Sequence, residues 1–187
     1  MGKYRFTTDW FSMNIPVWEK MLAELDGTPC QLLEIGSWEG RSAMWMADNL
    51  LSDRDSRLEC VDPWDSDYDS LFDANHAACE RRLRVNKHKG YSYTVLPTLY
   101  PRAQVGPCLD FAYIDGNHEA RCIVEDWVLT MPLMKAGGKI CFDDYQWDNQ
   151  LGSVHRTPDV GIDAIMNMWG DKVEVLYKGY QVWLRLK

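Results

Sequence analysis

The stretch LLEIGSWEGRS, residues 32–42, decides the fold of this chain. An apolar run ends there in Glu34 and two glycines, Gly36 and Gly40, and a helical pattern follows. Such a sequence predicts a strand that turns sharply into a helix, because glycine accepts the left-handed backbone that tight turns require. We expect backbone N–H groups of this turn to face a ligand. Together with Asp62, which ends the next apolar run, the turn indicates a cofactor that carries a nucleoside.

Length and composition indicate one globular protein. The chain has 187 residues, of which 46% are hydrophobic and 26% are charged, a balance typical of folded domains. The net charge of −8 argues against nonspecific binding to nucleic acid. No apolar run is long enough to span a bilayer. From the charge we therefore expect no nucleic-acid partner, and from the lack of such a run we expect no membrane partner. The six cysteines lack metal-ligand spacing, which favours reduced thiols and a cytoplasmic location.

Strand-like and helical patterns alternate along the chain, which predicts a largely parallel sheet with helices on both faces. Besides the opening stretch, we expect strands at 57–62, 91–96, 109–115 and 139–144. We expect helices at 14–25, 43–51, 71–85, 120–131 and 161–169. The tail, residues 172–186, fits an antiparallel hairpin that closes the sheet. The predicted fold is therefore α/β and doubly wound, with ligands bound beyond the carboxyl ends of the strands.

We expect a single domain over residues 1–187. Within it, residues 1–28 would form an N-terminal lid and helix, and residues 30–187 the cofactor-binding core. Two segments rich in aromatic residues, 4–13 and 145–160, are candidates for a lid over the substrate. An aromatic lid favours a flat or sugar-like substrate, although the same segments also suit a contact within a homo-oligomer.

The turn GSWEG departs from the dinucleotide-binding pattern GxGxxG. Trp38 stands where a second glycine would let the backbone approach a pyrophosphate, which argues against a nicotinamide-dependent oxidoreductase. The pattern E-x-G-x-x-x-G, with Asp62 at the end of the next strand, resembles class I S-adenosylmethionine-dependent methyltransferases. The alternative is that the glycines only form a tight turn and that Asp62 caps a helix.

This resemblance implies a Rossmann-like sheet of seven strands and S-adenosylmethionine as the cofactor. Glu34 and the turn would surround the methionine part, Asp62 would accept hydrogen bonds from the ribose hydroxyls, and Trp64 would lie against the adenine. An acidic edge of the sheet also suits the positive sulfonium. The full set of predicted cofactor contacts is Glu34, Gly36, Ser37, Trp38, Gly40, Arg41, Ser42, Asp62, Trp64 and Asp115.

Acidic residues also end the predicted strands at 109–115 and 139–144. Asp115 ends one, Asp143 and Asp144 end the other, and adjacent strand ends lie about 5 Å apart. Carboxylates that close repel one another unless a cation lies between them, which predicts a divalent metal site, with Mg²⁺ as the first candidate. His118 follows near the same edge, and an imidazole can remove a proton from a hydroxyl near neutral pH. Singly, these residues also fit a helix cap or a solvated loop.

A second resemblance is narrower. IDGNH at residues 114–118, the acidic pair and tryptophan at 125–127, and LMKAGGKICFDD at 133–144 are similar to the macrocin-type sugar O-methyltransferases, a family 24-like group. The resemblance implies that Asp115, Asp143 and Asp144 hold the metal and that His118 is the catalytic base. Some relatives place an aspartate base where this chain has Asn117.

The predicted function is S-adenosylmethionine-dependent, Mg²⁺-assisted O-methylation of a small hydroxylated molecule, such as a sugar, a phenol or a natural product. His155, in the second aromatic segment, is the second candidate for the base. Two alternatives stay open: a module that binds S-adenosylmethionine without turnover, and a nicotinamide-dependent oxidoreductase.

Overall fold

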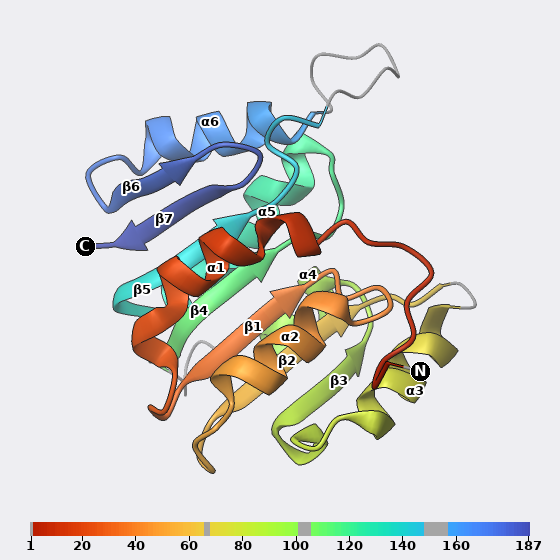
Figure 1. Cartoon of the computed structure of the whole chain (residues 1–187). Coiled ribbons are helices and arrows are strands. Elements are labelled where there is room, and N and C mark those ends of the chain that lie inside the picture. Colours follow the sequence, from red (N-terminus) through yellow and green to blue (C-terminus); the bar gives the residue numbers. More distant parts are fainter. Residues whose placement is uncertain (1, 66–67, 101–105, 148–156) are drawn as a thin grey trace.

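The computed structural model describes residues 2–65, 68–100, 106–147 and 157–187 (Figure 1). The strands form one sheet in the order β3-β2-β1-β4-β5-β7-β6. The strands are β1 Gln31–Ile35, β2 Arg57–Asp62, β3 Val85–Lys89, β4 Leu109–Ile114, β5 Met134–Phe142, β6 Val173–Lys178 and β7 Val182–Leu186. β7 is antiparallel to β5 and β6, and the other neighbours pair in parallel. The predicted doubly wound α/β sheet with its C-terminal hairpin is confirmed.

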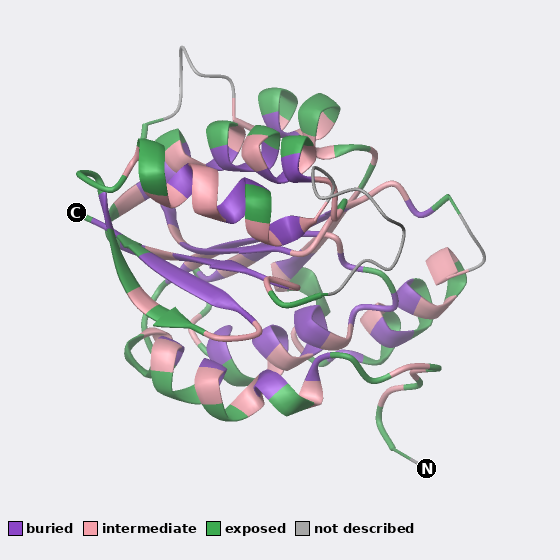
Figure 2. Cartoon of the chain, turned by 90° about the horizontal axis from the view of Figure 1, so that it is seen from above, coloured by how far each residue is buried: buried purple, intermediate pink, exposed green. Residues whose placement is uncertain are grey.

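Helices cover both faces of the sheet. They are α1 Ile15–Leu22, α2 Arg41–Leu50, α3 Tyr68–Ala78, α4 Ser92–Leu99, α5 Ala120–Thr130 and α6 Pro158–Met168. Short 3₁₀ turns are η1 Ser12–Asn14, η2 Ala23–Leu25, η3 Arg82–Arg84 and η4 Met131–Leu133. Figure 2 shows the buried strands between two helical layers whose outer surfaces are exposed. No helix in the described part of the chain is long and apolar enough to cross a membrane.

β1 is covered on both faces, which explains why its sequence is nearly continuously apolar. Leu32 packs in the cluster that α1, α2 and α3 share with the sheet, whereas Leu33 and Ile35 pack in the cluster on the opposite face, with α5 and α6. Side chains alternate along a strand, so Glu34 lies on the side of Leu32. Its carboxylate accepts a hydrogen bond of 2.5 Å from Ser42 Oγ of α2.

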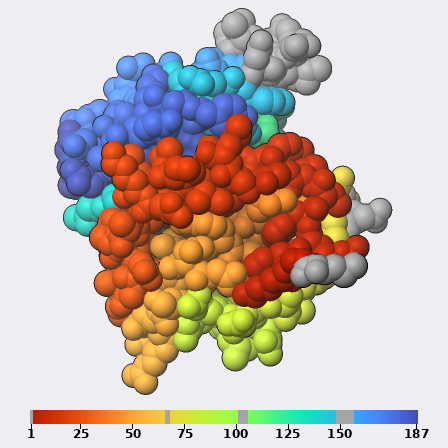
Figure 3. All heavy atoms as spheres, viewed as in Figure 1, coloured from red at the N-terminus to blue at the C-terminus, as the bar shows by residue number. Residues whose placement is uncertain are grey.

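Trp18 of α1 is the centre of the first cluster. Its ring is fully buried and makes edge contacts, with ring centroids 4.8–5.6 Å apart, with Phe11, Trp45, Phe111, Tyr113 and Trp183. The helix has Pro16 in its first turn, where the missing N–H costs nothing. The N-terminal residues that precede α1 lie across this face of the molecule, between α3 and α1 (Figure 3). The first helix therefore joins the sheet through aromatic packing.

The prediction of the third strand, at residues 91–96, is wrong. Residues 91–96 lie in and next to α4, and the third strand is β3, where we predicted no separate strand. The helix expected at 71–85 ends at Ala78. β3 is polar because it lies at the edge of the sheet, where Lys87 binds Asp69 of α3. An edge strand with charged side chains lacks the apolar pattern by which we recognised the others.

We expect Trp18→Ala to lower the free energy of unfolding by about 3–5 kcal/mol, the usual cost of deleting a large buried aromatic side chain. Trp10, whose side chain is mostly exposed, is the matched control, and Trp10→Ala should stay within about 0.5 kcal/mol of the wild type. Chemical denaturation measures both. Equal effects would contradict the central place of Trp18.

Candidate functional site

A cavity of about 990 Å³ opens at the carboxyl ends of β1, β2, β4 and β5. The chain reverses its direction of winding between β1 and β4, and ligands of open α/β sheets bind at such a switch point. The predicted site residues that line the cavity are Gly36, Trp38, Asp62, Trp64, Asp115, His118, Asp143 and Asp144. The structure thus brings the predicted cofactor turn and the predicted metal residues to one space.

Gly36 begins the turn after β1. Its backbone is left-handed, with φ of +88°, and a Cβ atom there would lie 2.0 Å from the carbonyl oxygen of Asp115. The Gly36 N–H donates to the carbonyl oxygen of Val61 at 2.8 Å. A side chain at position 36 is therefore excluded both by conformation and by space.

The Asp62 carboxylate ties this turn to the end of β2. Its Oδ2 accepts the N–H groups of Ser37 at 2.9 Å and Trp38 at 3.0 Å, and its Oδ1 accepts the N–H of Trp64 at 2.7 Å. The expectation that these turn N–H groups are free for a ligand is therefore wrong, because a neighbouring carboxylate occupies them. A carboxylate has about four acceptor positions, so Asp62 retains capacity for a further hydroxyl donor, and its contact with a ribose stays a prediction.

Three non-glycine residues in the described part of the chain have positive φ: Trp38 (+48°), Trp64 (+42°) and Asp144 (+58°). All three line the cavity. Such backbone costs roughly 1–3 kcal/mol per residue and is concentrated at functional sites. Trp64 is nearly buried and donates its indole N–H to the carbonyl oxygen of Trp38 at 2.8 Å. Its predicted stacking on a base remains a prediction.

The other predicted cofactor residues lie on the far side of the turn. Ser37, Arg41 and Ser42 line a smaller hollow that shares Gly36 with the large cavity. Glu34 is fully buried behind them, and burial raises its pKa to about 7. Gly40 packs against a phenyl ring of α3. The structure therefore brings only part of the predicted cofactor set to the large cavity.

The same turn holds the N-terminal segment, which the sequence did not indicate. The buried Glu39 carboxylate accepts the Thr7 N–H at 2.7 Å and the Thr7 hydroxyl. Arg41 donates to the Thr8 carbonyl oxygen at 2.8 Å and pairs with Asp9 at 3.3 Å. Arg41, predicted to contact the cofactor, thus fastens the segment that leads to α1.

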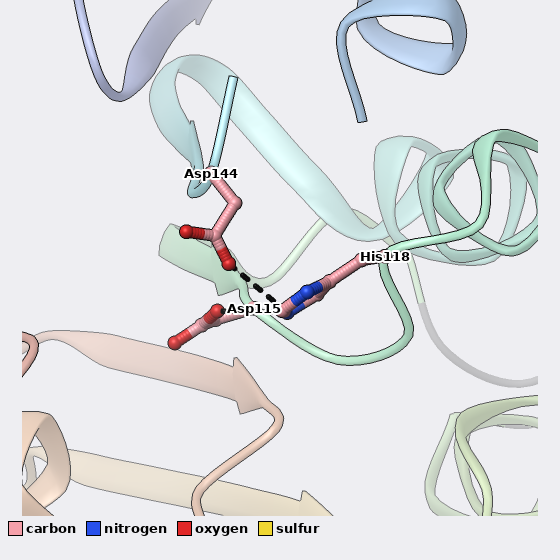
Figure 4. A group of neighbouring side chains, drawn as sticks. All are labelled: Asp115, His118 and Asp144. Carbon is pink, nitrogen blue, oxygen red and sulfur yellow. Dashed lines mark ion pairs between the residues drawn. The ribbon is translucent and has the colours of Figure 1, made fainter. Parts of the chain in front are cut away.

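Asp115, His118 and Asp144, which line the cavity beside the ends of β4 and β5, point toward one another (Figure 4). One ligand atom from each lies within 4.8 Å of the others. His118 Nε2 is 3.0 Å from Asp144 Oδ2 and 3.9 Å from Asp115 Oδ1. Burial alone would raise the pKa of Asp144, but hydrogen bonds from His118 and Tyr180 lower it below its ordinary value. Two carboxylates and an imidazole are donors that suit a divalent cation.

Asp143 lines the same cavity but is not part of this group. Its Oδ2 accepts the Tyr113 hydroxyl and the Gln181 amide, the latter at 3.2 Å. Burial, with the charge of Asp144, raises the pKa of Asp143. Tyr113 and Gln181 were missed from the sequence, although Tyr113 precedes Asp115 by two residues and therefore shares its side of β4. Gln181 gives no such signal.

The Tyr113 hydroxyl also lies 3.0 Å from Asp115 Oδ2. A hydroxyl has one hydrogen, so it cannot donate to Asp143 and Asp115 at once. Burial, with the charges of Asp143 and Asp144, raises the pKa of Asp115 well above its ordinary value.

Aromatic side chains form the outer wall of the cavity. Trp38 stacks on Tyr68, with ring centroids 3.8 Å apart, and the exposed Trp10 lies at 6.0 Å from Trp38. Trp147 contacts the His118 ring edge-on at 4.8 Å. Of the second predicted lid segment, residues 148–156 lie outside the described residues, and with them His155.

The loop after β3 adds residues that the wrong strand prediction concealed. Gly90, Tyr91 and Ser92 line the cavity, and the Ser92 hydroxyl donates to the buried Asp126 of α5. Burial raises the pKa of Asp126 to about 7. A correct β3 would have placed this loop beside Asp62, because parallel strands end at the same edge of the sheet.

Comparison with known proteins identifies relatives in sequence and in structure. The model of a family described as a methyltransferase domain matches residues 33–145. An uncharacterized protein of Acanthamoeba polyphaga mimivirus, R132, is 25% identical over 152 residues, which cover 75% of this chain and 64% of that protein. The chain therefore spans less than two thirds of the length of this relative.

Solved structures share the fold. An O-methyltransferase from Bacillus cereus in complex with SAH has a TM-score of 0.75 at 17% identity, over 97% of this chain and 84% of that one. TomG, an O-methyltransferase from Streptomyces achromogenes involved in tomaymycin synthesis, in complex with SAM, has a TM-score of 0.72 at 20% identity, over 91% and 78%. MycE from the mycinamycin pathway, in complex with Mg, SAH and mycinamycin VI, has a TM-score of 0.70 at 15% identity, over 96% and 50%.

Because the pKa of Asp126 is raised, the free energy of unfolding should depend on pH. The folded protein binds this proton up to about pH 7, whereas an unfolded aspartate loses it near pH 3.9. The free energy of unfolding of the wild type should therefore fall, relative to Asp126→Asn, by about 1.4 kcal/mol per pH unit between roughly pH 4 and 7. Denaturation at several pH values measures this difference, and a difference independent of pH would contradict the prediction.

Proposed function

Because the chain belongs to the class I S-adenosylmethionine-dependent methyltransferases, through the family model that matches residues 33–145, we propose that it methylates a hydroxyl group of a small molecule with the help of Mg²⁺. The observation that carries the proposal is the single cavity that joins the Gly36 turn and Asp62 to the Asp115, His118 and Asp144 cluster. The first group suits a nucleoside cofactor, and the second, directly beside it, suits a proton transfer next to a cation.

The cavity fits S-adenosylmethionine in size and charge. Its lining holds one arginine, Arg121, and eight carboxyl groups: Asp9, Asp62, Asp65, Asp115, Glu125, Asp126, Asp143 and Asp144. An excess of carboxylates favours a positively charged ligand. When bound, the cofactor supplies a methyl group already activated on a sulfonium. Asp62 and the rigid turn orient it, and positioning of the two reactants accounts for most of the rate acceleration.

The donor set fits a divalent cation. Asp115 and Asp144 offer carboxylate oxygens, which lie within 4.8 Å of each other and of a nitrogen of His118. Asp143, which we predicted as a third carboxylate ligand, directly follows β5 and precedes Asp144. When bound, the metal acts as a Lewis acid that makes the acceptor hydroxyl more acidic.

We assign the proton transfer to His118. In its neutral form Nε2–H donates to Asp144 Oδ2 at 3.0 Å, which leaves the lone pair on Nδ1 to accept the hydroxyl proton. Asp144 and the edge contact with Trp147 hold the ring. His118 therefore acts as the general base, and Asp144 sets its orientation.

The aromatic wall favours an acceptor with a flat or sugar-like ring. Trp10, Trp38 and Trp147 expose 66%, 38% and 37% of their surface at this wall. Ring faces provide stacking area without a need for charge. The mycinamycin VI in the MycE complex and the role of TomG in tomaymycin synthesis support a natural product as the acceptor class.

A thermal melt tests the cofactor. SAH at a hundred times its dissociation constant should stabilise the protein by about 2.7 kcal/mol, whereas NADH should leave the melting temperature unchanged, because Trp38 opposes a pyrophosphate. A shift with NADH and none with SAH would favour the oxidoreductase alternative instead.

Removing the proposed base tests the chemistry. His118→Ala should lower methyl transfer by about 10²–10⁴-fold while SAH binding stays unchanged. His88, which pairs with Glu59 at the edge of the sheet, is the matched control, and His88→Ala should keep its activity. The assay measures methylated product from a panel of sugars and phenols at neutral pH. Full turnover of His118→Ala would remove the base role, and SAH binding without turnover on any acceptor would favour the binding module.

A further inference from the structure

The two acidic residues that follow β5 make different contacts. Asp144 points into the cavity, where its Oδ2 meets His118 Nε2 at 3.0 Å. Asp143 also lines the cavity but is only 8% exposed, and it is not part of the group that Asp115, His118 and Asp144 form. Two adjacent residues of the same type therefore have different surroundings, which predicts different roles.

Asp143 is occupied by donors from this chain. Its Oδ2 accepts the Tyr113 hydroxyl and the Gln181 amide, and its Oδ1 accepts the Asp144 N–H at 2.8 Å. Three of about four acceptor positions of the carboxylate are thus filled. For Asp143 to turn toward a metal, the buried Gln181 amide would lose this partner and the Tyr113 hydroxyl would retain only Asp115, which is unfavourable.

The bond to the Asp144 N–H has a structural purpose. Asp144 has a left-handed backbone, with φ of +58°, which is uncommon for a residue with a side chain. The Asp143 carboxylate holds the N–H of this bend, and the Tyr180 hydroxyl donates to Asp144 Oδ1. Together these bonds direct Asp144 Oδ2 toward His118 and Asp115.

The hydrogen bonds that hold Asp143 extend through Gln181 to Trp18 of α1. Gln181 Oε1 accepts the indole N–H of Trp18 at 2.9 Å and that of Trp183 at 3.4 Å. With its oxygen fixed in this way, the Gln181 amide group must present its NH₂ to Asp143. Since Trp18 is fully buried, the amide has a rigid anchor.

We infer that Asp143 is a positioning residue, which holds Tyr113 and the bend at Asp144, and that Asp115 and Asp144 are the carboxylates that bind the divalent cation beside His118. The inference rests on the metal-assisted function proposed above and replaces the prediction of Asp143 as a ligand. Tyr113 and Gln181 become part of the metal site without touching the metal.

Mn²⁺ alone, without SAH or acceptor, is the probe. Electron paramagnetic resonance of free Mn²⁺ gives the dissociation constant, and water-proton relaxation gives the number of waters bound to the protein-held ion. Asp144→Ala should weaken binding and add about one bound water, because a ligand is removed. Asp143→Ala should weaken binding about 10-fold, as supporting residues do, with the water number unchanged.

Two conservative variants separate positioning from loss of folding. Tyr113→Phe removes only the hydroxyl and should also weaken Mn²⁺ binding about 10-fold without an added water. Asp143→Asn keeps an oxygen that accepts the Asp144 N–H and should recover part of the affinity lost in Asp143→Ala. Melting temperatures of the variants identify any that fail to fold.

Three results would overturn the inference. An added water in Asp143→Ala would make Asp143 a ligand. Unchanged affinity in Asp143→Ala and in Tyr113→Phe would remove the positioning role. A wild type that binds SAH but no Mn²⁺ would remove the metal from the proposed function and this inference with it, and that result is distinguishable because it involves no variant.

Discussion

The close approach of the backbone at Gly36 to that at Asp115 is the contact on which both halves of the site depend. β1 and β4 run side by side in parallel, and the Asp115 N–H donates to the Ile35 carbonyl oxygen at 2.8 Å. The turn that we assign to the cofactor and the loop that begins the metal cluster therefore leave the sheet in direct contact. A methyl donor on one and an acceptor on the other would meet without any movement of the strands.

The cavity gathers carboxylates that would repel one another in isolation, and each is compensated differently. Asp62 accepts backbone N–H groups, Asp143 accepts a hydroxyl and an amide, and Asp144 faces an imidazole. Burial and the charges of Asp143 and Asp144 raise the pKa of Asp115 well above its ordinary value. The position with the least compensation from the chain is thus the one at which a cation is most favourable.

The sequence predicted the features that follow from periodicity and from strand ends. Apolar runs located β1, β2, β4 and β5, and their acidic ends placed Asp62, Asp115 and Asp144 at one edge. β3 was missed because an edge strand is stabilised by ion pairs such as Lys87 with Asp69 rather than by burial. The directions of Asp143 and Asp144 depend on a backbone bend and on distant partners, and no local pattern encodes either. The same holds for the N–H groups of the turn, which a residue in the next strand occupies.

The N-terminal segment is attached to the cofactor turn through Thr7 with Glu39 and through Arg41 with the Thr8 carbonyl oxygen. Asp9 both lines the cavity and pairs with Arg41, whereas Trp10 and Met13, the other side chains that the segment adds to the wall, are mostly exposed and take no part in those bonds. The two large apolar side chains of the wall are thus separate from the residues that attach the segment. Substitutions at positions 10 and 13 would alter the shape of the wall while the segment stays fastened, so the acceptor selectivity that we propose could change without a change in the turn that we assign to the cofactor.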